Sequence, residues 1–144
     1  MSNATRPSRV RGFTDPIVWT HALFLVNAYL WQVAGSSVCA VLMLVSAFFS
    51  TMYHRNAERP GFWQETDRGA AFLTLLVTLI FALPFASGPM VFNAFLLLGA
   101  ALLVKTLAIR TGKYRLWHSL WHFMVAVGQA YLAWVYTVGN ATFG

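Results

Sequence analysis

Two pairs of side chains and one carboxylate give this sequence its chemical character. Ser50 and His54 are four residues apart, His118 and His122 have the same spacing, and Asp67 lies between the two pairs. Residues i and i+4 of a helix share one face, about one turn apart, so each pair can act together. Three imidazoles, a carboxylate and a hydroxyl suit a zinc ion that keeps one position open for water, which is the arrangement of a hydrolytic metal site.

Each of these residues also has an ordinary role that the sequence leaves open. A serine in a membrane helix commonly bonds back to its own backbone, as Ser50 can. Asp67 is placed to cap a helix that begins there. The two histidines of HSLWH can instead ligate a haem or form buried hydrogen bonds. Metal binding is favoured because SxxxH and a carboxylate accompany the HxxxH pair.

The composition predicts a membrane protein. The chain has 144 residues, of which 58% are hydrophobic and 10% are charged, whereas a soluble domain carries about 25% charged residues. The basic residues behind the net charge of +6 cluster between apolar segments, which favours a role in membrane topology over nucleic-acid binding. Ionisable side chains are costly at membrane depth, so those gathered here are expected to form a functional site.

The apolar segments predict an all-α fold, a polytopic transmembrane helical bundle in an integral, multi-pass membrane protein. A single transmembrane domain is expected over residues 17–138, between a polar basic N-terminal tail at 1–16 and a short C-terminal tail at 139–144. With about 20 residues needed per crossing, the five expected transmembrane helices are 17–33, 36–54, 67–86, 89–109 and 116–138.

The positions of the basic residues predict the orientation. The tail, the loop between the second and third helices, the loop between the fourth and fifth helices, and Lys105 together hold all ten Lys and Arg residues. The two connections at the other helix ends hold none. Positively charged loops stay on the cytoplasmic side, so the N-terminus is expected to be cytoplasmic and the C-terminus on the opposite side. This orientation places every candidate site residue near the cytoplasmic helix ends.

The order of these motifs resembles the CREST superfamily of membrane hydrolases, which includes alkaline ceramidases, progestin and adipoQ receptors and haemolysin III-like proteins. SxxxH ends the second helix, Asp opens the third and HxxWH lies in the last, and STMYH and HSLWH are most similar to the ceramidase branch. The resemblance implies zinc ligands at His54, His118 and His122, with Asp67 and Ser50 as catalytic residues. It further implies hydrolysis of a membrane lipid amide or ester by a water that the metal activates, with Asp67 as the base.

The predicted number of helices departs from that family. Its members usually have seven transmembrane helices, whereas five are expected here. A second copy of the chain or a partner membrane subunit is therefore a candidate for completing the walls of the lipid cavity. His21, Tyr53 and Trp121 are candidates for the layer of residues around the ligands, and His21 also for a gate, although a core or interfacial histidine is the ordinary alternative.

Two other functions are compatible with the same residues. One is a small subunit of a membrane complex, either haem-binding or purely structural. A haem-binding subunit would hold the haem between His54 and one histidine of the last helix. This function leaves Ser50 and Asp67 without a role. A receptor or scaffold would keep zinc only for stability. The combination of motifs favours a zinc-dependent lipid hydrolase over both alternatives.

Overall fold

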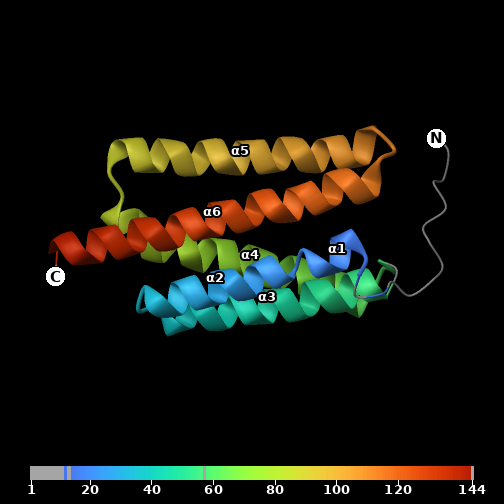
Figure 1. The fold of residues 1–144 in the computed structure, drawn as a ribbon, viewed down its shortest axis with the longest axis horizontal. Helices are drawn as coiled ribbons and strands as arrows, with labels where there is room; N and C mark the ends of the chain where they lie inside the picture. Colours follow the sequence, from blue (N-terminus) through green and yellow to red (C-terminus); the bar gives the residue numbers. More distant parts are fainter. Residues whose placement is uncertain (1–11, 13, 57, 144) are drawn as a thin grey trace.

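Helices account for all the regular structure in the part of the chain that is described, which is residues 12, 14–56 and 58–143 of the computed structural model. The elements are α1 (Pro16–Trp19), α2 (Ala22–Val33), α3 (Ser37–Arg55), α4 (Phe62–Ala82), the 3₁₀ turn η1 (Leu83–Phe85), α5 (Gly88–Arg110) and α6 (Tyr114–Phe143). They run side by side as a bundle (Figure 1). The predicted all-α class is confirmed, and the basic tail at residues 1–11 lies outside the described residues.

Among the described residues, three helical segments are long and apolar enough to cross a bilayer: α3, α4 together with η1, and α5. The outer face of the bundle exposes large apolar side chains, including Val33, Phe72 and Ile109, which are 67%, 68% and 75% exposed. Many large apolar side chains exposed on a small bundle are compatible with contact with a membrane or a partner. The finding is compatible with a membrane protein, and the expected five crossings stay a prediction.

The first expected helix, 17–33, is interrupted. Asp15 caps the short helix α1 by accepting a hydrogen bond from the backbone N–H of Ile17, 3.0 Å away. At the other end the N–H of His21 bonds to the carbonyl of Val18 at 3.2 Å, a tight i→i−3 bond that closes α1 before α2 begins at Ala22. His21 therefore lies at a break between two helices rather than inside one.

The third expected helix begins at Phe62 rather than at Asp67. Gly61, at φ 128°, adopts a conformation that side chains rarely allow, and it ends the loop that starts after α3. The next residues turn helical because Trp63 packs on Phe48 and Phe49 of α3, with ring centroids 6.3 and 6.4 Å apart. Asp67 consequently lies in the second turn of α4, and its predicted role as a helix cap is wrong.

The last helix continues through residue 143, so the expected C-terminal tail at 139–144 is helical over nearly all its length. Gly139 makes close packing possible at this end, since a Cβ there would overlap the side chain of Phe85 in η1. The long helix α6 thus spans the whole bundle and reaches the connection between α4 and α5.

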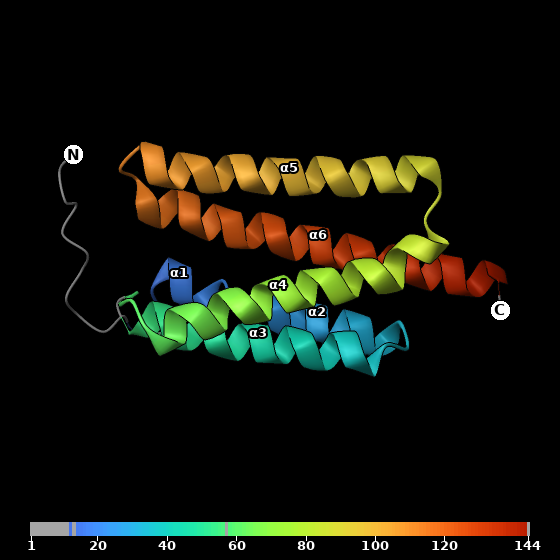
Figure 2. The same ribbon diagram turned by 180° about the vertical axis from the view of Figure 1, so that it is seen from behind.

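Helix α6 is the centre of the packing. It contacts α2 and α4 on one side and α5 on the other, as Figure 2 shows from behind. Small residues and hydrogen bonds bring the helices together: Asn27 of α2 donates to the carbonyl of Ala126 at 3.0 Å, and the hydroxyls of Ser46 and Thr74 lie 2.7 Å apart between α3 and α4. Helix α5 packs mainly on α6, which leaves a space between α4 and α5.

Candidate metal centre

All four histidines of the chain converge at one end of the bundle, the end that also carries the α3–α4 and α5–α6 connections. His21 comes from the break between α1 and α2, His54 from the last turn of α3, and His118 and His122 from the first turns of α6. Each is at most 8% exposed. Two helices and the break between α1 and α2 thus bring the four rings into a buried cluster, and the i, i+4 spacing places His118 and His122 on one face of α6.

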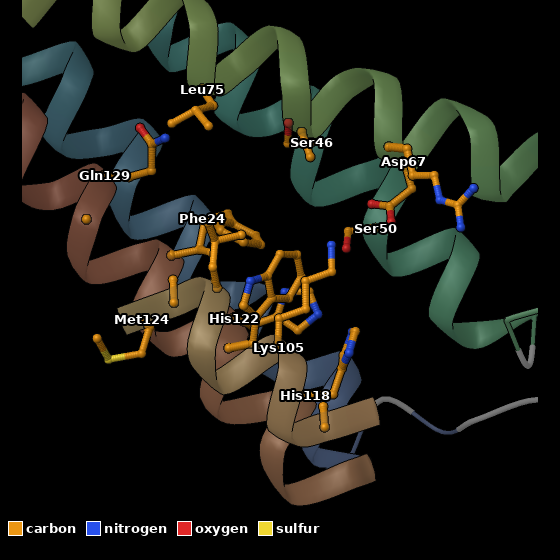
Figure 3. Close-up of a pocket in the computed structure, with 18 of the residues that line it drawn as sticks. Phe24, Ser46, Ser50, Asp67, Leu75, Lys105, His118, His122, Met124 and Gln129 are labelled. Carbon is orange, nitrogen blue, oxygen red and sulfur yellow. The ribbon is translucent and has the colours of Figure 1, made fainter. Parts of the chain in front are cut away.

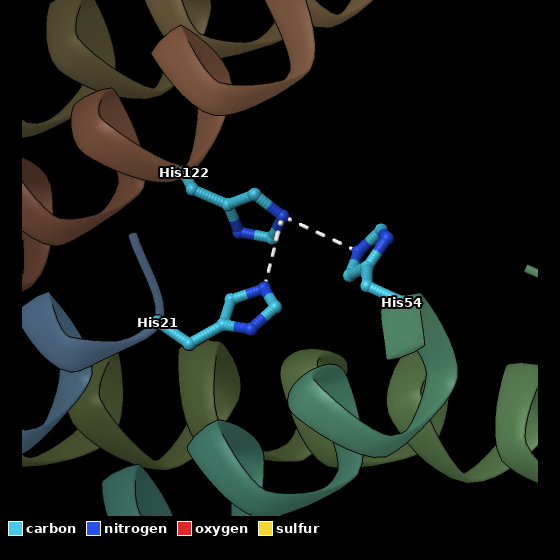
Figure 4. Close-up of side chains that lie close together, drawn as sticks. All are labelled: His21, His54 and His122. Carbon is cyan, nitrogen blue, oxygen red and sulfur yellow. Dashed lines mark hydrogen bonds between the residues drawn. The ribbon is translucent and has the colours of Figure 1, made fainter. Parts of the chain in front are cut away.

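The ring nitrogens are spaced as metal ligands would be. The Nε2 atom of His54 lies 3.2 Å from that of His118 and 3.3 Å from that of His122, and the Nε2 atoms of His122 and His21 are 3.4 Å apart. Nitrogens bound to zinc at 2.0–2.1 Å in a tetrahedron lie about 3.3–3.4 Å from one another. The ligand atoms of His21, His54 and His122 all lie within 4.8 Å of one another (Figure 4). This group contains His21 in place of the predicted ligand His118, whose Nε2 is close to that of His54. The rings of His21, His54 and His122 could therefore hold a metal ion.

Two oxygen atoms hold rings of the cluster from outside. Nδ1 of His54 donates to Oε1 of Glu58 at 3.0 Å, and Nδ1 of His21 is 3.2 Å from the hydroxyl of Thr51. A proton held on Nδ1 leaves the Nε2 lone pair free to bind a metal and fixes the ring orientation. The arrangement of His54 and Glu58 is the carboxylate–histidine pair that commonly supports a zinc ligand.

Glu58 is a site residue that the sequence reasoning missed. It follows α3 and has φ 55°, a left-handed conformation that is uncommon for residues other than glycine, asparagine and aspartate. Such conformations cluster where the surrounding structure needs a side chain in one place. The spacing of four residues between His54 and Glu58 was the one indication in the sequence. The composition of the loop gave no reason to expect the Glu58 carboxylate to point toward the His54 ring.

We expect Glu58→Gln to weaken zinc binding by about tenfold, since loss of the outer partner of a ligand typically costs 10- to 100-fold and glutamine keeps an acceptor oxygen. The matched control is Glu65→Gln, because the side chain of Glu65 is 70% exposed and pairs with Arg68 at the surface. Competition with a chelating dye measures both affinities. Equal affinities in the two variants would show that Glu58 does not support the centre.

Ser50 and Asp67 lie beside the cluster rather than in it. The hydroxyl of Ser50 is 3.2 Å from Nε2 of His21. Asp67 is half-buried on α4 and faces Ser50 across the gap to α3 (Figure 3). Lys105 of α5 points to the same place, with Nζ 4.9 Å from the ring centroid of Trp121. The sequence analysis used Lys105 only as one of the basic residues that predict the orientation in the membrane. Its position near Asp67 was therefore not predicted.

The two aromatic candidates line the cluster. The ring centroid of Tyr53 lies 4.9 Å from that of His54, and the Tyr53 hydroxyl accepts a hydrogen bond from Gln64 at 3.1 Å. The Trp121 ring lies 4.9 Å from His122 and 5.4 Å from His118, measured between centroids. Both side chains thus pack against the histidine rings, as residues around a metal centre do.

A cavity of about 1560 Å³ meets the cluster on one side. His54, His118 and His122 line it, together with Ser50 and Asp67. The remaining wall is mainly apolar and comes from α3, α4, α5 and α6, including Leu75, Leu79 and Leu98. The titratable groups and the apolar wall therefore face one shared space.

Comparison of the chain with protein-family models, with curated proteins and with solved structures finds no match. The resemblance to the CREST superfamily therefore stays a prediction.

Proposed function

We propose that this chain is a multi-pass membrane protein that binds zinc through His54, His118 and His122 and hydrolyses an amide or ester bond of a membrane lipid, in the manner of the CREST superfamily. The observation that carries the proposal is the position of the histidine cluster. The Nε2 atom of His54 lies 3.2 and 3.3 Å from those of His118 and His122, and all three histidines line a mainly apolar cavity that also exposes a carboxylate and a hydroxyl.

Zinc, when bound, acidifies a water and polarises a carbonyl oxygen. Asp67 is the group that takes the proton, because it is the carboxylate of the cavity that faces Ser50 and is not bonded to a histidine ring. The Ser50 hydroxyl is placed to orient the carbonyl group of the substrate. Lys105 of α5 brings a positive charge to the same side of the cavity.

A lipid substrate is supported by the walls and the opening of the cavity. Phe72 of α4 and Phe95 of α5 both line it and are 68% and 59% exposed, so the cavity reaches the outer surface between these helices. In a bilayer that surface faces acyl chains, and Leu79 and Leu83 extend the apolar wall away from the histidines. A chain entering sideways would place its head-group linkage at the cytoplasmic end, beside the cluster.

The spacing of the ring nitrogens favours a metal ion over a haem. Two axial imidazoles of a haem face each other across the porphyrin plane. Nε2 atoms 3.2–3.4 Å apart, with their rings packed edge to face, leave no room for that plane. The haem-binding subunit is therefore the weaker alternative.

The test is turnover of a panel of ceramides, N-acyl amino acids and lysolipids by the full-length protein in lipid nanodiscs. We expect release of fatty acid from at least one class, lost on chelation and restored by zinc. Zinc at one ion per chain without turnover of any lipid would overturn the hydrolase and favour the zinc-stabilised receptor or scaffold.

The orientation has its own prediction. In a background with the buried Cys39 replaced by alanine, Arg59→Cys and Lys113→Cys should react with an impermeant maleimide from the cytoplasmic side, and Ser87→Cys only from the other side. The reason is that both basic residues lie in connections at one end of the bundle and Ser87 lies at the other. Labelling of Arg59→Cys and Lys113→Cys from opposite sides would contradict the layout.

A further inference from the structure

Lys105 carries a charge inside α5, a helix that is long and apolar enough to cross a bilayer. It lies five residues before Arg110, the last residue of that helix. A charge inside such a segment is costly, and it ordinarily reaches the interface or faces a cavity. Lys105 is one of the residues that line the cavity, and its side chain points toward Ser50 and Asp67 (Figure 3). A charged side chain in this position indicates a binding function.

The ammonium group of Lys105 has no anionic partner of its own. Among the described residues it forms neither a hydrogen bond nor an ion pair, and its contact is the ring of Trp121, whose centroid is 4.9 Å from Nζ. Two other carboxylates that line the cavity are engaged, since Glu58 is bonded to a histidine ring and Asp15 pairs with an arginine at 2.9 Å. Asp67 is the base of the proposed reaction. The three N–H donors of the lysine are therefore available to a ligand.

The polar end of the cavity carries a small excess of positive charge. Among the described residues, four basic side chains, Arg68, Lys105, Lys113 and Arg115, line the cavity against three acidic ones. They come from the first turns of α4, the end of α5 and the start of α6, at the same end of the bundle as the histidines. Positive charge around an opening raises the local concentration of anions. An apolar wall with a basic end suits an anionic amphiphile.

Trp121 links the lysine to the histidine cluster. One face of the contact is the Lys105 ammonium, and the same ring lies 4.9 Å from His122 and 5.4 Å from His118 between centroids. One aromatic ring thus separates the positive charge from the histidines. A lipid with its linkage at the histidines and its acyl chain along the apolar wall would bring its head group to Lys105.

We propose that Lys105 binds the head group of the lipid, so that the substrate is an acyl lipid with a carboxylate or a phosphate close to its amide or ester linkage. The inference rests on the hydrolase of the proposed function and names its substrate class. Lys105 determines specificity in this assignment and does not touch the reacting atoms. The competing explanation is that Lys105 only balances the charge of Asp67, in which case its loss affects charged and neutral substrates alike.

Two matched pairs of lipids test the assignment on the full-length protein in phosphatidylcholine nanodiscs. N-oleoylglycine is compared with N-oleoylglycinamide, and oleoyl lysophosphatidic acid with monooleoylglycerol. In at least one pair we expect kcat/KM for the anionic lipid to be about tenfold higher or more, as one charge-assisted hydrogen bond allows. The pair that shows the preference identifies the anion as carboxylate or phosphate. No preference in either pair would overturn the proposal.

Substitutions of Lys105 separate the two explanations. Lys105→Gln should reduce the preference by about tenfold or more, and Lys105→Arg should retain most of it because arginine keeps the charge. The matched control is Arg110→Gln, which removes a positive charge from the same helix at a residue that does not line the cavity. It should keep the preference of the parent. An equal fall for both members of a pair in Lys105→Gln would assign Lys105 to Asp67 and overturn the head-group site.

Binding distinguishes this proposal from the hydrolase. In a protein that hydrolyses none of the four lipids, displacement of a photoreactive N-oleoylglycine analogue still reports head-group binding. A preference for the anionic lipids that is lost in Lys105→Gln would then overturn the enzyme and leave the head-group site intact. Turnover without such a preference would do the reverse. A protein from which none of the lipids displaces the analogue, and which hydrolyses none, would overturn both.

Discussion

His122→Ala is expected to abolish stoichiometric zinc binding, with affinity falling well beyond the 10- to 100-fold that loss of an outer partner costs. The Nε2 atom of His122 lies within 3.4 Å of the Nε2 atoms of both His54 and His21, so it has two neighbours in the cluster. The ring is 2% exposed in the middle of the packing, and water cannot reproduce a fixed imidazole there. Elemental analysis of protein purified without chelators measures the effect.

Gln129→Ala is the matched control for this prediction. Gln129 is on the same helix, is 4% exposed and lines the same cavity, but it lies seven residues further along α6, about 10 Å from His122 along the axis. It should retain about one zinc ion per chain. Equal zinc content in His122→Ala and the parent would eliminate the metal centre, and equal loss in both variants would indicate a general collapse of the fold.

The sequence carries enough information for the histidines because their placement depends on helix geometry alone. A spacing of four residues puts His118 and His122 on one face, and the same spacing puts Ser50 and His54 on one face of α3, wherever those helices begin. Both expected helices exist at these positions, so the convergence of the two motifs follows once the end of α3 and the start of α6 lie at the same end of the bundle.

The helix boundaries were less predictable, because they depend on contacts between elements. Phe62 and Trp63 read as loop residues beside a charged segment, yet packing of Trp63 on α3 makes them the first turn of α4. The break before α2 likewise depends on local i→i−3 bonds around Thr20. No glycine or proline at this point of the sequence indicates the break. The altered start of α4 moved Asp67 into the helix.

The outer support of the site was unpredictable for a related reason. Glu58 reaches His54 only because its own backbone is left-handed, and Thr51 reaches His21 only because α1 and α2 are separated at that point. Lys105 turns inward because the cavity between α4 and α5 gives its side chain room beside Trp121. Only the contact of Glu58 with His54 has a helical spacing, and the contacts of Thr51 and Lys105 are revealed by the fold alone.

Asp67→Asn should keep the zinc ion and the fold while turnover of a lipid amide or ester falls by a factor on the order of 100 or more, within the range of general acid–base catalysis. Asparagine matches the size of aspartate and can still contact Ser50, but it cannot take a proton. Because Asp67 lies in the second turn of α4 and Gly61 precedes the helix, the substitution removes no helix cap. A change in activity therefore cannot be attributed to a loss of the helix start.

The control for Asp67 is Asp15→Asn, a change of the same chemistry at the same end of the bundle. Asparagine caps a helix as well as aspartate does, and the pair that Asp15 forms with Arg115, whose side chain is 65% exposed, contributes little to stability. Asp15→Asn should keep zinc and turnover. If Asp67→Asn also keeps turnover, the base of the reaction is another group. If it loses zinc together with turnover, Asp67 supports the metal centre rather than the proton transfer, because a pure base leaves the ligands untouched.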